Sequence, residues 1–164
     1  MLSCHSQGPN IGVEFFVREG EIVQTKLFPR DAEGVTWELF SDSRCPLLES
    51  KVSSWMDQYC SGKQSKEQLP VTYRMLSPFT QSVLTRLISL PFGGHLSYME
   101  LASEIGRPKA CRAVGNACGH NPLPLIIPCH RVLAHNQRLG GFSLGLTLKK
   151  RLLQHEGVLQ RGGL

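Results

Sequence analysis

Residues 97–118 read SYMELASEIGRPKACRAVGNAC, and this stretch decides the fold of the second half of the chain. Ser97 and Glu100 have the spacing of a capping box, in which each side chain accepts from the other residue's backbone amide, so we expect a helix over residues 98–105. A glycine ends that helix, and a second helix is expected over residues 109–118. Two short helices joined by a tight turn are typical of a helix-turn-helix, and a plain helical hairpin is the alternative.

The second of these helices has an unusual composition. Ala110, Ala113, Gly115 and Ala117 are small, and Arg112 projects among them. Small residues let a helix backbone approach another surface closely, but they are poorly suited to reading base edges in a wide groove. The pattern fits close approach to a DNA minor groove, where an arginine could occupy space within the base stack. The alternative is that the alanines pack against a neighbouring helix.

Outward from this stretch, Ser77 and Pro78 form a good N-cap and first-turn pair. They predict a helix that ends before Pro91 and whose apolar stripe is Phe79, Val83, Leu87 and Ile88. On the other side, Leu-Ile-Ile-Pro-Cys-His-Arg-Val occupies residues 125–132. Proline stiffens the approach to Cys129, which suits a nucleophile held in one geometry.

Cysteine reacts as the thiolate, so Cys129 needs a base or a positive neighbour, and His130 is the candidate base. Successive side chains of an extended backbone point to opposite faces. The pair therefore requires either a sharp turn for direct contact or a water molecule that relays the proton. A third group, a carboxylate, would orient the imidazole. A buried structural cysteine beside a surface histidine is the alternative.

A last helix is expected over residues 146–156, with a basic run at residues 149–151. Glu156 lies at its C-terminal end, where the helix dipole disfavours an anion, and this invites a functional explanation. The second half of the chain has only three acidic residues, of which Glu100 is assigned to the helix cap and Glu104 to the surface. By elimination, Glu156 is expected to orient the histidine.

The first half predicts a hairpin over residues 11–30, a helix over residues 46–60 and a short strand over residues 68–73. The expected fold is therefore an α/β N-terminal module, a small sheet plus a helix, at residues 1–75. A mostly helical C-terminal domain with the helix-turn-helix follows at residues 76–164. The first module contains no catalytic pattern of its own, and its expected role is support.

Charge is distributed unevenly between these halves. Residues 1–75 contain 8 Lys and Arg against 10 Asp and Glu, a net charge of −2, and residues 76–164 contain 10 against 3, a net charge of +7. The whole-chain charge of +5 therefore comes from the second half. A basic domain with few acids suggests a polyanionic partner, nucleic acid before membrane. A merely soluble basic face is the alternative.

The remaining features exclude several classes of protein. No apolar run approaches the roughly 18 residues of a membrane span, and residues 1–6 lack the pattern of a secretory signal. We therefore expect an intracellular, cytoplasmic protein without a membrane partner, or a nuclear one in a eukaryote. The cysteines form no C-x-x-C pair and are expected to be free thiols. The nearest candidate zinc ligands are Cys118, His120, Cys129 and His130, whose spacing matches no common zinc pattern, so no metal is expected.

Taken together, these motifs resemble the O6-alkylguanine-DNA alkyltransferases, also called methylated-DNA–protein-cysteine methyltransferases. The resemblance covers roughly residues 77–157, and the first half resembles the family's variable N-terminal module more loosely. The matching blocks, in chain order, are Ser97-Tyr98, Pro108-Lys109-Ala110, Arg112-Ala113-Val114-Gly115, Asn121-Pro122, Ile127-Pro128-Cys129-His130-Arg131-Val132, Phe142-Ser143 and His155-Glu156-Gly157.

The resemblance implies a reaction and a set of catalytic residues. Cys129 would accept the alkyl group from O6-alkylguanine in DNA, irreversibly and once per molecule, with O4-alkylthymine as a candidate second substrate. His130 would deprotonate the thiol through a water molecule, and Glu156 would hold His130. Asn121 would tie the helix-turn-helix to residues 125–132, here called the cysteine segment. Tyr98 would donate a proton to the leaving base. No cofactor is implied.

The resemblance also implies how DNA is bound. A monomer would bind double-stranded DNA through the minor groove with the alkylated base everted. Tyr98 would rotate the phosphate, Arg112 would fill the vacated stack, and Arg107 is a further DNA-binding candidate. The residues expected to line the base pocket are Val132, Phe142 and Ser143.

Three rival functions are weighed against this one. A non-repairing alkyltransferase-like protein that only binds lesions lacks the cysteine, whereas this chain has Cys129. A Cys–His hydrolase would need an oxyanion hole and would leave the helix-turn-helix without a role. A transcription regulator would need a second DNA-reading module, for which the chain offers little room.

Overall fold

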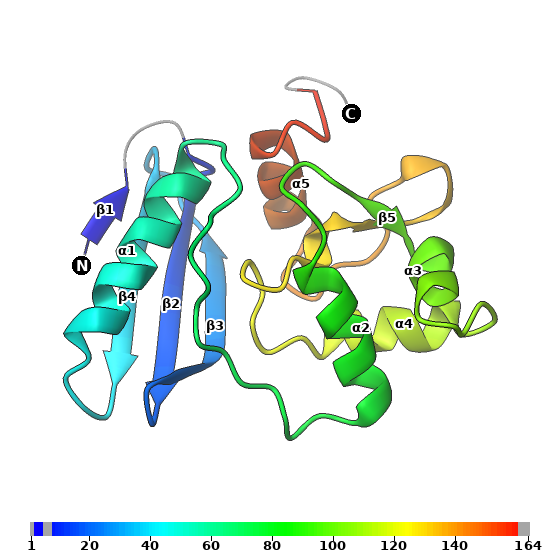
Figure 1. The fold of residues 1–164 in the computed structure, drawn as a ribbon. Helices are drawn as coiled ribbons and strands as arrows, with labels where there is room; N and C mark the ends of the chain where they lie inside the picture. Colours follow the sequence, from blue (N-terminus) through cyan, green and yellow to red (C-terminus); the bar gives the residue numbers. More distant parts are fainter. Residues whose placement is uncertain (1, 5–7, 161–164) are drawn as a thin grey trace. The chain divides into compact units, whose positions relative to one another are not determined.

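The structure is a computed structural model that describes residues 2–4 and 8–160. It contains two units, residues 1–72 and 73–164, and each is described by itself (Figure 1). Among the helices of the described chain, none is long and apolar enough to cross a membrane.

The predicted hairpin is confirmed and forms the centre of the first unit. Strand β2 (Ile11–Arg18) pairs antiparallel with β3 (Glu21–Pro29). The two turn residues, Glu19 and Gly20, have φ angles of 50° and 78°. Positive φ at both central positions is characteristic of a type I′ turn, which suits a two-residue hairpin because the twist of the turn matches that of the strands.

Strand β4 (Val35–Ser41) lies on the other side of β2 and is parallel to it, and β1 (Leu2–Cys4) pairs antiparallel with β4. The strand order is therefore β1-β4-β2-β3. Strand β4 is absent from the predicted elements, although the alternation of Val35 and Trp37, both buried, could have indicated it.

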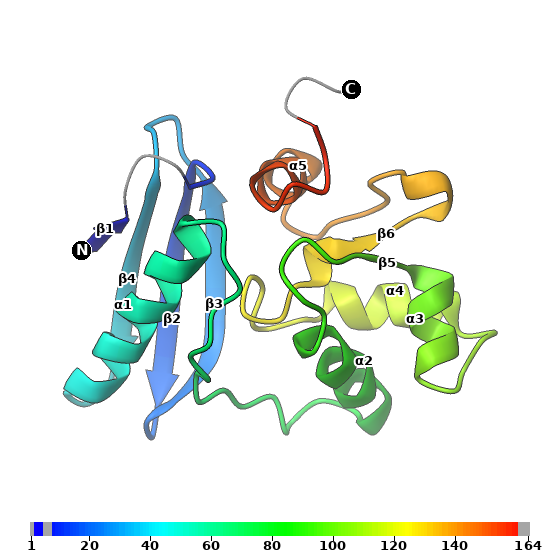
Figure 2. The same ribbon diagram turned by 45° about the horizontal axis from the view of Figure 1, so that its top comes forward.

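Helix α1 (Pro46–Cys60) has the predicted bounds and covers one face of this sheet (Figures 1 and 2). Gly8, which precedes β2, packs closely against β4 and α1. A Cβ atom at that position would lie 2.6 Å from Cγ2 of Val35 and 3.6 Å from Sγ of Cys60. The residues of α1 that are buried are Leu48, Val52, Met56, Tyr59 and Cys60.

The strand predicted at residues 68–73 is wrong. The structure has only an isolated bridge between Ile22 and Val71 there. The amide of Ile22 donates to the carbonyl of Pro70 at 2.8 Å, and the amide of Thr72 donates to the carbonyl of Ile22 at 3.1 Å. Pro70 has no N–H to continue the ladder, so the pairing does not extend.

The second unit is built mainly from helices, which are α2 (Pro78–Ile88), α3 (Tyr98–Glu104), α4 (Cys111–Gly119) and α5 (Leu146–His155). The predicted cap of α2 is confirmed, because Oγ of Ser77 accepts from the amide of Thr80 at 3.2 Å. One member of the predicted stripe is wrong. The side chain of Ile88 is 41% exposed, and Leu84 is buried in its place.

Helices α3 and α4 form the helix-turn-helix (Figure 2). The predicted capping box is present at its start. Oγ of Ser97 accepts from the amide of Glu100 at 3.1 Å, and the carboxylate of Glu100 accepts from the amide of Ser97 at 2.7 Å. Helix α4 begins at Cys111, two residues later than predicted. The amide of Ala110 donates to the carbonyl of Arg107 at 2.8 Å, which closes a turn before the helix.

A short parallel pair of strands joins distant parts of the second unit. Strand β5 (Leu96–Ser97) pairs with β6 (Val132–Leu133), with Leu96 opposite Val132 and Ser97 opposite Leu133. Because α3 begins directly after β5 and β6 begins at the last residue of the cysteine segment, this pairing brings the start of the helix-turn-helix beside Cys129. It was not predicted from the sequence.

Candidate active site

Cys129 begins a one-turn 3₁₀ helix, η1 (Cys129–Arg131), and the residue is only 4% exposed. The side-chain nitrogen of Asn121, Nδ2, donates to Sγ of Cys129 at 3.1 Å and to the carbonyl of Ile127 at 2.8 Å. The other end of the same side chain, Oδ1, accepts from the amide of Leu123 at 3.0 Å. Asn121, which follows α4, therefore holds the cysteine segment at two points, and its own side chain is fixed by the amide of Leu123.

The imidazole of His130 contacts a buried carboxylate. Nε2 of His130 lies 2.8 Å from Oε1 of Glu156, so the structure brings together the two residues that elimination had paired. Arg131 completes the cluster, because its Nε donates to Oε2 of Glu156 at 2.6 Å and its Nη2 donates to Oε1 at 3.0 Å. A third nitrogen of the guanidinium donates to the carbonyl of Leu90 at 2.7 Å.

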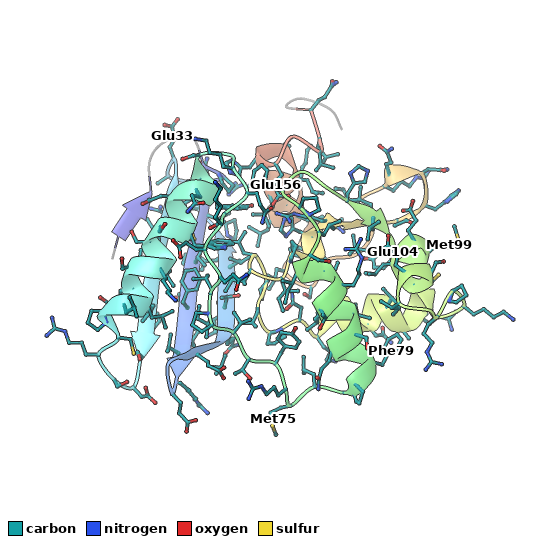
Figure 3. All side chains as sticks on the ribbon, viewed as in Figure 1. Glu33, Met75, Phe79, Met99, Glu104 and Glu156 are labelled. Atoms are coloured by element: carbon teal, nitrogen blue, oxygen red, sulfur yellow. The ribbon has the colours of Figure 1, made fainter. Side chains whose placement is uncertain are left out.

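This cluster lies inside its unit, unlike the other two acidic residues of the second half. Figure 3 shows Glu156 just after α5 among surrounding side chains, whereas Glu104 lies at the end of α3 on the side that faces α2. Glu104 forms an exposed ion pair with Arg86 at 2.5 Å. Of the three acids, only Glu156 is placed where it can act on the histidine.

Burial and charge set the protonation states of the cluster. Burial raises the pKa of Glu156, but the influence of His130 and the hydrogen bonds and charge of Arg131 outweigh it and lower the pKa to about 2. Burial lowers the pKa of His130 below its ordinary value of 6.5, against the opposing influence of Glu156. At neutral pH the carboxylate is therefore ionised, and the imidazole is neutral.

The hydrogen bonds also fix which nitrogen of His130 is basic. A carboxylate only accepts hydrogen bonds, so Nε2 of the neutral ring must carry the proton that it shares with Glu156. Nδ1 then has a free lone pair, and among the described residues it has no hydrogen-bond partner. The turn at η1 does not produce a direct Cys129–His130 hydrogen bond, which leaves the water-relayed alternative.

The thiol is held in a resting form. Burial raises the pKa of Cys129, while the hydrogen bond from Asn121 and the positive charge of Lys149 act in the opposite direction. Because burial is the larger influence, the protonated thiol predominates at neutral pH. A reaction through the thiolate would therefore need a base at the moment of attack.

Tyr98 lies between α4 and the loop that follows β6. Its ring lies 3.8 Å from the position of a Cβ built at Gly115 and 3.3 Å from one built at Gly140. Its hydroxyl donates to the carbonyl of Gly141 at 3.3 Å. Burial, together with the thiols of Cys118 and Cys129, raises the pKa of Tyr98, so the phenol keeps its proton at neutral pH.

The other predicted site residues differ in exposure. Val132 is buried, Phe142 is half-buried, and Ser143, Arg107 and Arg112 are exposed. Both arginines belong to the helix-turn-helix, where they are accessible to a partner. Within the described part of the chain, no three His, Cys, Asp or Glu side chains gather in a way that could hold a metal ion, and the absence of a metal stays a prediction.

Comparison with known proteins decides the family. A family model described as the DNA-binding domain of 6-O-methylguanine DNA methyltransferase matches residues 78–158. A methylated-DNA–protein-cysteine methyltransferase from Shigella flexneri is 33% identical over 141 residues, which cover 76% of this chain and 82% of that protein. The chain belongs to the methylated-DNA–protein-cysteine methyltransferase family.

Two further matches define the extent of this methyltransferase likeness. The human methylated-DNA–protein-cysteine methyltransferase is 40% identical over 119 residues, which cover 68% of this chain but only 56% of the human protein. The chain thus spans little more than half the length of that relative. The crystal structure of Mycobacterium tuberculosis OGT in complex with DNA matches with a TM-score of 0.68 and 26% identity, covering 88% of this chain and 92% of that one. The predicted fold class is confirmed.

Two buried cations of this methyltransferase-family chain were not predicted as site residues. The sequence presents Arg131 only as part of the motif around Cys129, and Lys149 only as part of a basic run on the last helix. Lys149 is instead fully buried, and its Nζ donates to the carbonyl of Val132 at 2.6 Å. A helical period could have indicated it, because Lys149 lies between the buried Leu148 and Leu152 on α5.

Proposed function

We propose that the chain repairs alkylated DNA by direct reversal. Cys129 accepts the alkyl group from O6 of guanine irreversibly, so each molecule acts once, as a monomer and without a cofactor. DNA binding and transfer belong to the second unit. The observation that carries this proposal is the buried thiol of Cys129, held by Asn121 next to a histidine whose basic nitrogen is free and whose other nitrogen is bonded to Glu156.

The proton and electron pairs can be followed through the transfer. The thiol proton of Cys129 passes through a water molecule to Nδ1 of His130, and Glu156 stabilises the imidazolium that forms. The thiolate attacks the alkyl carbon, an S–C bond forms and the C–O6 bond breaks, with its electron pair remaining on the base. Tyr98 donates a proton to that base, and the imidazolium proton restores the phenol. The net result is S-alkylcysteine and unmodified guanine.

The proposed partner is double-stranded DNA bound through the minor groove. The exposed Arg107 and Arg112 on the helix-turn-helix, and the net charge of +7 in residues 76–164, support a polyanionic partner. The related OGT structure is a complex with DNA. Eversion of the target base costs a few kcal/mol and is easiest for a base that already pairs poorly. Arg112 would fill the space that the everted base leaves.

The base pocket is proposed to lie where Tyr98, Val132, Phe142 and Ser143 converge on the cysteine segment. The hydrogen bond from Tyr98 to Gly141 and the β5–β6 pairing support this placement, since they hold the phenol beside the loop that carries Phe142. The carbonyl of Val132 already accepts from Lys149, so its second lone pair would serve the base.

A mass measurement tests the proposal. The protein is mixed with a duplex that carries one O6-methylguanine, and its intact mass is compared before and after. We expect a gain of one methyl group per chain, on the peptide that contains Cys129. Cys129→Ser should keep lesion binding and lose the transfer, whereas Cys45→Ser, which changes a half-exposed cysteine of the first unit, should behave like the unaltered protein.

Other outcomes would overturn the proposal in different ways. Transfer by the Cys129→Ser variant would make another cysteine the acceptor. An unchanged mass with retained binding to the lesion would favour the non-repairing binder. An unchanged mass without any preference for the damaged duplex would remove DNA repair altogether.

A further inference from the structure

Lys149 is a lysine in the interior of the second unit without an acidic partner. Its side chain is fully buried, and among residues 8–160 no carboxylate forms an ion pair with it. Burial lowers the pKa of Lys149 from 10.5 to about 8, while the thiols of Cys129 and Cys118 act in the opposite direction. Burying an ammonium group is unfavourable unless its charge and donors are used.

The ammonium group of Lys149 donates hydrogen bonds to backbone carbonyls of two segments, the one that follows Cys129 and the loop that precedes Phe142. Nζ donates to the carbonyls of Val132 at 2.6 Å, of Leu139, and of Gly141 at 3.3 Å. Val132 directly follows the turn that carries the cysteine, and Leu139 and Gly141 lead into Phe142, whose ring centroid lies 5.9 Å from Nζ. One ammonium group thus connects the cysteine segment to the loop that forms the proposed pocket wall.

The charge of Lys149 also acts on the thiol. The titratable groups that influence Cys129, or that Cys129 influences, are Tyr98 of α3, Cys118 of α4 and Lys149 of α5, with His130, Glu156 and Arg131 in the adjoining cluster. The negative charge of Glu156 is offset by its pairing with Arg131. The tyrosine and the second thiol are neutral at neutral pH. Lys149 is therefore the positive group that opposes the effect of burial on Cys129.

We propose that Lys149 is a positioning residue for the transfer reaction, whose ammonium group holds the Phe142–Ser143 loop against the cysteine segment and stabilises the thiolate of Cys129. The inference deepens the proposed function, because it takes Cys129 as the alkyl acceptor. The negative charge of the thiolate is then stabilised by the ammonium group of Lys149. Because that group is already in place, it does not have to be reorganised during the reaction.

The test measures thiol reactivity without DNA. Full-length protein is treated with iodoacetamide over a range of pH, and the alkylation rate of the Cys129 peptide is read by mass spectrometry, with the half-buried Cys111 as an internal reference. We compare Lys149→Met, which removes the charge, with Lys149→Arg, which keeps it. Lys150→Met is the matched control, since it removes a charge from the next, half-buried position of the same helix.

The expected result is a shift of the pH profile rather than a uniform loss. In Lys149→Met the inflection for Cys129 should move to higher pH, and the rate at neutral pH should fall about tenfold for each pH unit of that move, because only the thiolate reacts. Lys149→Arg should restore most of the shift, and Lys150→Met should show none. An unchanged inflection in Lys149→Met would overturn the electrostatic role.

A second measurement keeps Lys149 in place and decides the question if Lys149→Met does not fold or the reagent does not reach Cys129. The pKa of Lys149 is followed by NMR in the unaltered protein and in Cys129→Ser. Interaction between two groups is reciprocal, so the thiolate that forms at high pH should extend the titration of Lys149 to higher pH in the unaltered protein than in Cys129→Ser. Identical Lys149 titration curves in both proteins would overturn the electrostatic role.

The holding role has its own measurement. Hydrogen exchange of the amides at residues 138–143 should be faster in Lys149→Met than in the unaltered protein, and unchanged exchange would refute this role. None of these experiments uses DNA. They therefore remain informative if the chain transfers no alkyl group from DNA, and a failure of the proposed function is distinguishable from a failure of this inference.

Discussion

Replacing Glu156 with glutamine removes the charge that pairs with Arg131 in the interior of the second unit while keeping the shape of the side chain. The carboxylate accepts hydrogen bonds from Nε and Nη2 of Arg131 and from Nε2 of His130. A glutamine has one acceptor oxygen in place of two, and its NH2 group would face a donor. The variant therefore leaves a buried guanidinium without a counter-charge.

The loss of stability follows from two independent magnitudes. The difference between the ordinary carboxyl pKa of 4.5 and the value of about 2 for Glu156 corresponds to roughly 3 kcal/mol, at about 1.4 kcal/mol for each pH unit. Breaking a buried ion pair by removing one partner typically costs about 3–5 kcal/mol. We therefore expect Glu156→Gln to lower the free energy of unfolding by about 3–5 kcal/mol at neutral pH.

The pH dependence gives the prediction a second signature. The folded pKa of Glu156 is lower than the unfolded one, so its stabilisation is complete above pH 4.5 and is lost as the pH falls toward 2. The pKa of His130 is also lowered on folding, so proton uptake by the unfolded chain destabilises both proteins as the pH falls below 6.5. The variant lacks the first effect, and without the charge of Glu156 the pKa of His130 is lowered further. Both differences vanish once Glu156 and His130 are protonated in the folded proteins, so the two stability curves should converge at acid pH.

Urea unfolding at a series of pH values, followed by far-ultraviolet circular dichroism, measures both signatures. Glu104→Gln is the matched control, because it makes the same chemical change in an exposed ion pair with Arg86, for which we expect a loss of less than about 1 kcal/mol. Equal stabilities of the two variants, or a constant difference between Glu156→Gln and the unaltered protein down to the lowest pH, would refute the reasoning.

Three further changes test other parts of the site. Arg112→Ala should slow methyl transfer from duplex DNA by tenfold or more, since about 1.4 kcal/mol of lost eversion energy is a factor of ten, while iodoacetamide still alkylates Cys129 at the normal rate. Gly140→Ala should slow transfer too, because its φ of 65° strains alanine and the new Cβ would lie 3.3 Å from the ring of Tyr98. Ser97→Ala should cost about 1 kcal/mol in urea unfolding by removing a helix cap.

Two of these changes have a matched control in the chain. Gly141→Ala changes the next residue, where φ is not in the left-handed region and no atom lies within 4 Å of a built Cβ, so its transfer rate should exceed that of Gly140→Ala. Ser82→Ala, which changes an exposed serine inside α2, should cost less than Ser97→Ala. Equal slowing of transfer and of iodoacetamide alkylation by Arg112→Ala would contradict a role in eversion.

Features that depend only on neighbouring residues could be predicted from the sequence. The hairpin turn at Glu19-Gly20, the start of α1 at Pro46 and the capping box at Ser97 are fixed by local backbone preferences and spacing, and all three are present. The small number of acidic residues in the second half was equally informative. With only three acids in the second half, elimination pointed to Glu156, and the structure brings it to His130.

Tertiary structure decided what depends on segments that are distant along the chain. Strand β4 pairs with β2, and β5 pairs with β6. The sequence pattern of each strand does not specify which strand it pairs with. Lys149 and Lys150 are adjacent and carry the same charge, but the packing of α5 against the rest of its unit buries Lys149 completely, with its Nζ bonded to backbone carbonyls, and leaves Lys150 half-buried. Burial gives these groups their chemistry, because a charge removed from water must find its partners in the protein.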